Sequence, residues 1–172
     1  MLYLFGFDEV AFVAGDVFFV DPNPLAGQEG AEAGVRIELR RLVRQPLRAS
    51  IYSAQPASLA EPLWRGDFFE SFPDGRNRRD RVHYHPFFNG WDPAKRHFDE
   101  ELSADPLAWL EKRLANLGEM LGVEAHPDAA ALSARSGEIV ETVDRLWQRV
   151  RSGELDPPAG WTSKPAYRLG WL

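Results

Sequence analysis

The sequence predicts an α+β fold: an antiparallel β-sheet, or a partly closed barrel, from the N-terminal half, covered on one side by two or three C-terminal helices. Two observations favour it. Residues 35–40 alternate apolar and polar side chains, which is typical of a half-buried strand. After Asp105, leucines recur at helical spacing, and the change between the two patterns falls near Pro86.

The 172 residues fit one domain, 1–172. We expect mainly strands in residues 1–90, mainly helices in 91–155, and a tail, 156–172, whose tryptophans dock it on the body. The chain has no cysteine, which excludes disulfides, thiolate metal sites and cysteine nucleophiles. No run approaches the roughly 18 apolar residues of a membrane span, and the apolar start lacks the basic flank of a signal peptide. We therefore expect a cytoplasmic protein without a membrane partner.

The net charge of −6 argues against bulk binding to nucleic acid. Seventeen of the 20 basic residues are arginine, a bias that a GC-rich genome would explain. A functional explanation is that planar guanidinium groups bind carboxylates or phosphates.

The N-terminal strands are predicted from aromatic and β-branched runs. Residues 10–13 and 17–20 flank Ala14-Gly15-Asp16 and read as a hairpin, followed by a loop over residues 21–34. Further strands are expected over 35–40, 47–53, 63–69 and 81–85, with a turn at 44–46. Residues 63–85 then form a hairpin whose long tip carries Arg76, Arg78 and Arg79.

Capping patterns predict the helices. Asp92-Pro93 can begin a short helix, and Asp105-Pro106 begins a longer one that ends at Gly122. A helical turn is expected over residues 128–135. A last helix runs from Ser136 to Gly153, and its apolar stripe consists of Ile139, Val143, Leu146 and Val150.

A cluster of polar residues follows from the predicted hairpin. Successive strand residues point to opposite faces, so the register that buries Trp64, Phe68, Val82 and Tyr84 together groups five polar residues on the other face. These are Arg65, Asp67, Arg81, His83 and His85. Arg48 and Tyr52 extend this face if residues 47–53 form a strand, and Arg36, Glu38 and Arg40 do so from residues 35–40.

The cluster suits a small hydrolase, an RNase-like phosphodiesterase that needs no metal. His83 and His85 would be general acid and base, since imidazole titrates near neutral pH. Asp67 would orient one ring, and Arg65 and Arg81 would stabilise charge on the phosphate, with Arg48 and Tyr52 as further anion contacts. The partner is then an anionic substrate such as RNA.

Three other interpretations stay open. A divalent metal could bind His83, His85 and Asp67, although two nearby arginines would repel it. A non-catalytic module could use the same Arg/His-rich face to bind an anionic ligand or a protein partner. The face could also be merely solvated, with its charges paired across strands. The predicted site is ruled out if the histidines point into the aromatic core or if Asp67 lies far from them.

Several motifs are absent: a phosphate-binding glycine loop, a dinucleotide-binding βαβ unit, a Gly-x-Ser-x-Gly elbow and His-Glu-x-x-His. Their absence disfavours P-loop NTPases, Rossmann dehydrogenases, α/β-hydrolases and common zinc proteases.

Overall fold

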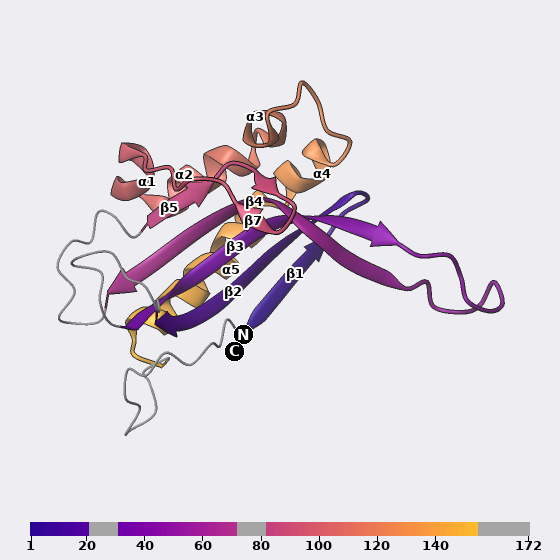
Figure 1. The fold of residues 1–172 in the computed structure, drawn as a ribbon, viewed down its shortest axis with the longest axis horizontal. Helices are drawn as coiled ribbons and strands as arrows, with labels where there is room; N and C mark the ends of the chain where they lie inside the picture. Colours follow the sequence, from indigo (N-terminus) through magenta and orange to yellow (C-terminus); the bar gives the residue numbers. More distant parts are fainter. Residues whose placement is uncertain (21–30, 72–81, 155–172) are drawn as a thin grey trace.

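A computed structural model describes residues 1–20, 31–71 and 82–154 of the protein (Figure 1). The strands are β1 (Leu2–Gly6), β2 (Val10–Val20), β3 (Ala31–Arg44), β4 (Ala57–Ser71), β5 (Val82–His85), β6 (Phe88–Asn89) and β7 (Asp92–Pro93). The helices are α1 (Glu100–Ala104), α2 (Pro106–Leu114), α3 (Leu117–Leu121), α4 (Ala129–Ala134) and α5 (Ser136–Arg151). No helix among these residues is long and apolar enough to cross a membrane.

Strands β1 to β5 form one antiparallel sheet in the order β1-β2-β3-β4-β5. The sheet is open, so the α+β prediction is confirmed and the partly closed barrel is not formed. The helices lie against one face, where α5 crosses β2, β3 and β4 (Figure 1). The two short strands β6 and β7 make a separate hairpin after β5.

The N-terminal hairpin differs from its prediction. Residues 14–16 do not turn: β2 runs unbroken through them, and Gly15 pairs with Arg36 of β3. The turn lies instead at residues 7–9, between β1 and β2, where the Phe7 N–H donates to the Val10 carbonyl. Residues 31–34, expected in a loop, extend β3, because β2 is long enough to pair with them.

The predicted strand over residues 47–53 is absent. Strands β3 and β4 pair directly with each other as far as Arg44 and Ala57, so residues 45–56 are their connection, at the tip of a hairpin that projects from the body (Figure 1). Nothing among the described residues buries this connection: Ile51 is 81% exposed and Tyr52 91%. Alternating apolar and polar residues do not form a strand when no neighbouring part of the protein covers their apolar face.

The helices confirm most capping signals. The Asp105 side chain accepts from the Ala108 N–H and Pro106 begins α2, while Gly122 ends α3 with a φ of 68°. The single helix expected up to Gly122 is, however, divided in two, because the Asn116 side chain caps α3. Residues 92–93 form β7 rather than a helix start. The apolar stripe of α5 is buried, as predicted.

The core lies between the sheet and the helices. Trp64 of β4 stacks on Trp109 of α2, with ring centroids 6.1 Å apart, and on Tyr84 of β5 at 6.3 Å. Gly66 beside them leaves the space these rings need, since a Cβ there would lie 2.8 Å from Trp64 and 2.9 Å from Ile37. This packing fixes which face of β4 and β5 turns toward the helices.

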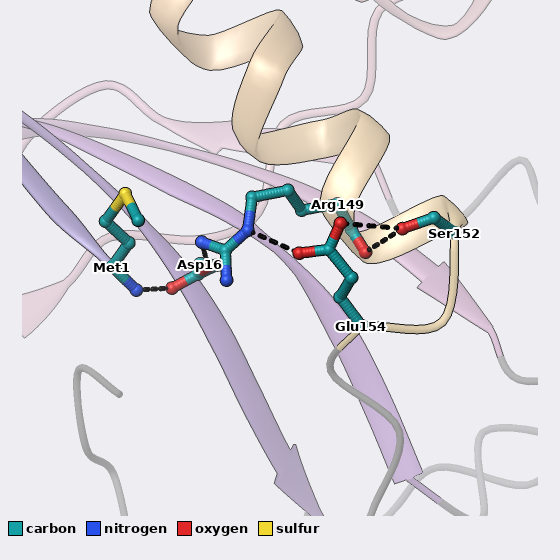
Figure 2. Close-up of polar contacts among 5 residues, drawn as sticks. All are labelled: Met1, Asp16, Arg149, Ser152 and Glu154. Carbon is teal, nitrogen blue, oxygen red and sulfur yellow. Dashed lines mark hydrogen bonds and ion pairs between the residues drawn. The ribbon is translucent and has the colours of Figure 1, made fainter.

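Two buried carboxylates tie distant segments together. Asp16 of β2 accepts from the Met1 amino group and from Nη1 of Arg149 on α5 at 2.7 Å (Figure 2). Asp128, before α4, accepts from three backbone N–H groups in the β1–β2 turn at 2.8–3.0 Å. Both carboxylates are therefore fully satisfied by hydrogen bonds, as buried polar groups require.

The Asp16 interactions give a first prediction. Asp16→Ala should lower the free energy of unfolding by about 2–3 kcal/mol, because it leaves Arg149 without its buried partner; Arg149 is partly exposed, which limits the loss. Urea unfolding followed by circular dichroism measures the change. Glu154→Ala is the matched control, since Glu154 also binds Arg149 (Figure 2) but is exposed, and its midpoint should stay near that of the wild type. Equal losses in the two variants would contradict the assignment.

Candidate functional site

The register of β4 and β5 groups the predicted polar residues. Asp67 lies opposite His83, and Arg65 lies opposite His85. The other faces of these strands turn Trp64, Phe68 and Val82 into the main core, with Tyr84 packed against it. The predicted separation of the two faces is therefore correct.

Asp67 is the centre of the cluster. Its Oδ1 accepts from Nε of Arg36, on β3, at 2.7 Å, and Nε of Arg65 lies 2.9 Å from its Oδ2. The Nε2 atoms of His83 and His85 lie 3.5 and 3.6 Å from the same Oδ2. The Arg65 Nε–H is not directed at Oδ2, so neither atom has a well-formed hydrogen bond among the described residues.

The cluster is buried, not a solvated sheet face. Asp67 is 1% exposed, and His83 and His85 are 3% each. Although they lie on the side away from the main core, the two imidazoles have aromatic neighbours: Phe69 and Phe98 contact the ring of His83, and Phe88 the ring of His85. The histidines therefore meet Asp67 as predicted, but within an aromatic shell that the sequence did not predict.

Residues 86–98 supply much of this shell by folding back beside β5. The backbone of His97 exchanges two hydrogen bonds with Tyr84, at 2.8 and 3.0 Å. Phe88 lies under the guanidinium of Arg65, and Trp91 under that of Arg40. Side chains from this segment therefore stack on the arginines of the polar face.

Both ring nitrogens of His85 are engaged. Nδ1 lies 2.6 Å from the carbonyl oxygen of Ala94, which can only accept, so Nδ1 carries the hydrogen. Nε2 lies 3.0 Å from Nη2 of Arg65, which can only donate, so Nε2 presents its lone pair. The backbone carbonyl of Ala94 thus fixes the tautomer of His85, a role the sequence analysis gave to Asp67.

The buried charges perturb one another. Burial alone would raise the pKa of Asp67, but Arg36, the two imidazoles and Arg65 hold it well below its ordinary value. Burial raises the pKa of Glu38, which faces Arg65 across β3 and β4, despite the opposing effect of Arg40 and Arg36. Burial also lowers the pKa of Arg65, partly offset by Asp67. The site therefore holds an ionised carboxylate among guanidinium groups.

Two predicted site residues are not in the cluster, and the structure does not describe a third. Arg81 lies outside the described residues, as do Arg76, Arg78 and Arg79 of the predicted basic tip. Arg48 and Tyr52 lie in the exposed β3–β4 connection, which projects away from β5 (Figure 1). Arg36 was expected on this face but not in the site, and the sequence could have suggested it, because β3 pairs directly with β4.

A groove of about 830 Å³ opens next to the cluster but does not contain it. Phe88 belongs to both: it lines the groove, and its ring centroid is 6.5 Å from that of His85. The groove also contains Arg41 and Arg44, which form exposed ion pairs with Glu61 and Asp8. Phe88 therefore separates the cluster from open space.

No family model, curated protein or solved structure matches this chain. The interpretation of the cluster therefore depends on its geometry and chemistry. Among the described residues, Asp67, His83 and His85 form the one group of potential metal ligands, with their ligand atoms all within 4.8 Å of one another.

The lowered pKa of Asp67 gives a second prediction. A depressed carboxyl pKa stabilises the fold above the unfolded value of about 3.9, and this contribution is lost as the pH falls through the folded pKa. At pH 7, Asp67→Asn should lower the free energy of unfolding by about 3 kcal/mol or more, because two guanidiniums lose their buried charged partner. The difference from the wild type should shrink below about pH 4.

Urea unfolding between pH 7 and pH 2.5 measures this effect, with Asp92→Asn as the exposed control. A difference between wild type and Asp67→Asn that stays constant over this range would contradict an ionised Asp67.

Proposed function

We propose that the protein is a small hydrolase that cleaves phosphodiester bonds, with RNA as its substrate class and the Asp67 cluster as its acid–base machinery. One observation carries this proposal. The β4–β5 register holds two imidazole nitrogens 3.5 and 3.6 Å from one buried carboxylate, with two guanidiniums beside them. General acid–base cleavage of a phosphodiester uses these groups.

The contacts suggest different roles for the two histidines. The Nδ1–H of His85 is held by Ala94, so its Nε2 lone pair can take the proton of an attacking 2′-hydroxyl. The Nε2 of His83 faces the Asp67 carboxylate, and His83 would take the role of the general acid. That ring would give its proton to the leaving 5′-oxygen, so protons balance across the step.

The two arginines beside Asp67 would have different roles: one would hold the carboxylate, and the other would contact the substrate. Arg36 donates to Oδ1 of Asp67 and holds the carboxylate in place. Arg65 contacts both Asp67 and the lone pair of His85, so His85 becomes a base only when this guanidinium moves. A phosphate would provide the competing anion, to which guanidinium binds strongly. Arg65 would then neutralise charge on the phosphate while freeing His85.

Access to the cluster would pass Phe88. This side chain lines the groove on one side and contacts Arg65 and His85 on the other. The groove volume is within the roughly 300–1,000 Å³ typical of small-ligand sites. A nucleotide bound in the groove would reach the cluster if Phe88 turned aside together with Arg65.

The cleavage proposal is tested with single-stranded RNA in the presence of EDTA. His83→Gln and His85→Gln should each lower the rate about 10²–10⁴-fold, the usual contribution of a general acid or base. The rate should show a bell-shaped pH dependence in the wild type and lose one limb in each variant. His97→Gln is the matched control and should leave the rate unchanged, since His97 does not line the groove.

Thermal unfolding of each variant separates catalysis from folding, since both cluster histidines are buried. A folded His85→Gln protein that cleaves RNA at the wild-type rate would disprove the acid–base assignment. Loss of activity in the His97 control would point to another site.

A second candidate function is supported by the closed state of the cluster. Both nitrogens of His85 are already engaged, and the imidazoles are nearly inaccessible, as suits a group that shapes a binding face without chemistry. The half-buried guanidiniums of Arg36, Arg40 and Arg65 would then bind an anionic ligand.

The binding function predicts that a fluorescently labelled RNA oligonucleotide binds without being cleaved, with an affinity that falls as salt rises. Arg40→Gln should weaken binding and flatten the salt dependence, because it removes one phosphate contact. Arg151→Gln, on α5 at the other face, is the control. Fluorescence anisotropy measures both, and salt-independent binding would contradict this function.

A further inference from the structure

We infer that Asp67, His83 and His85 form a site for a divalent metal ion, which Arg65 keeps closed in the resting protein. The inference does not depend on RNA cleavage, because it concerns the binding of a cation to the same three side chains. Two imidazoles and one carboxylate are a common protein ligand set for zinc and other first-row metals.

The spacing of the ligand atoms is the first support. Zinc binds imidazole nitrogen and carboxylate oxygen at about 2.0–2.1 Å, so two ligands of a tetrahedral site lie about 3.3–3.4 Å apart. Oδ2 of Asp67 lies 3.5 and 3.6 Å from the two Nε2 atoms, and all three atoms lie within 4.8 Å of one another. Small side-chain rotations would complete three corners of a tetrahedron.

The tautomer of His85 is the second support. A histidine that binds a metal through Nε2 almost always donates its Nδ1–H to a carbonyl or carboxylate, which fixes the ring. His85 makes this contact with the Ala94 carbonyl at 2.6 Å. Its Nε2 lone pair therefore points into the cluster with the ring already oriented for a metal ion.

The incomplete satisfaction of Asp67 is the third support. The carboxylate is 1% exposed, and its Oδ2 accepts no well-directed hydrogen bond from the described residues. Buried carboxylate oxygens ordinarily have such partners. A metal ion between Oδ2 and the two Nε2 atoms would supply the partner that this oxygen lacks.

Arg65 blocks the metal site in this structure, and its movement would control whether a metal ion can bind. Its Nε lies 2.9 Å from Oδ2 and its Nη2 lies 3.0 Å from Nε2 of His85, so the guanidinium lies against two of the three ligand atoms. Its side chain is 15% exposed and its outer face meets Phe88, so it has a route toward solvent. A metal ion would replace one cation with another.

The charged groups around the cluster are compatible with the replacement of the Arg65 guanidinium by a metal ion. When Arg65 leaves, the cluster loses one positive charge before the metal adds two, and Arg36 still neutralises Asp67 from the Oδ1 side. Glu38 faces Arg65 in the register and is buried, so its carboxylate lies close enough to offset part of the added charge. Three protein ligands leave a fourth position open, as in zinc sites that bind a water or a substrate.

The test uses the full chain without a polyhistidine tag, stripped with EDTA and dialysed. Zn²⁺ binding is measured by calorimetry, and Co²⁺ binding by the visible absorption of tetrahedral cobalt. We expect one ion per chain, and His83→Gln or His85→Gln should weaken binding about 100-fold. The double variant His97→Gln/His126→Gln retains only the cluster histidines and should bind as the wild type does.

Arg65→Met provides the decisive variant, since it removes the competing cation and keeps an unbranched apolar stem. It should bind Zn²⁺ at least about tenfold more tightly, the usual worth of a hydrogen bond to a charged group. A folded Arg65→Met protein that binds no better than the wild type would overturn the inference. Binding that disappears in the His97/His126 double variant would show an adventitious surface site instead.

A bound metal would also regulate the proposed hydrolase, and only this last point rests on that function. The metal would occupy the Nε2 lone pair of His85 and replace the Nε2 proton of His83, both of which the proposed catalysis needs. Zn²⁺ should therefore inhibit RNA cleavage, and EDTA should restore it. Zn²⁺ binding without any RNA cleavage would refute the hydrolase alone. Cleavage that Zn²⁺ does not affect, with no ion bound, would refute the metal site alone.

Discussion

The buried carboxylate of Asp67 constrains how the central strands of this sheet pair, because positively charged groups must lie next to it. An unpaired buried charge is strongly destabilising, so the fold must place compensating groups within contact distance. They come from three adjacent strands: Arg36 from β3, Arg65 from β4 itself, and His83 and His85 from β5. A slip of one residue between β4 and β5 would turn the histidines into the apolar layer under the helices, so the cluster and the register support each other.

Three of the four buried carboxylates among the described residues, Asp16, Asp67 and Asp128, differ in one respect that bears on function. Asp16 and Asp128 have hydrogen bonds to both oxygens, from the Met1 amino group and Arg149 in one case and from backbone N–H groups in the other. They connect distant parts of the chain and need nothing further. Asp67 has four cationic or imidazole nitrogens nearby, yet its Oδ2 accepts no well-directed hydrogen bond from the described residues. This oxygen is where the proposed metal ion would bind.

The site could be predicted in part because the burial of one face restricts how the two strands of a hairpin can pair. With Trp64 and Phe68 on one face of β4, and Val82 and Tyr84 on one face of β5, burial excludes a slip of one residue. Asp67 must therefore share a face with the two histidines, and the structure pairs it with His83. The aromatic shell could not be predicted, because Phe88, Ala94 and Phe98 reach the cluster only through the fold of residues 86–98. Arg48 and Tyr52 were misplaced for a related reason: alternation indicates a strand, but only a neighbouring strand makes one.

Arg65 links the two proposed uses of the cluster. Its guanidinium, a proton and a metal ion are three cations that compete for the same lone pair on His85, and only one can hold it at a time. In the structure the guanidinium contacts this nitrogen, and burial lowers the pKa of Arg65 because it disfavours the charged form. An anion that draws Arg65 outward would leave the imidazole to a proton, whereas a divalent ion would displace Arg65 directly. Under the two proposals, the position of the Arg65 side chain would decide which chemistry follows.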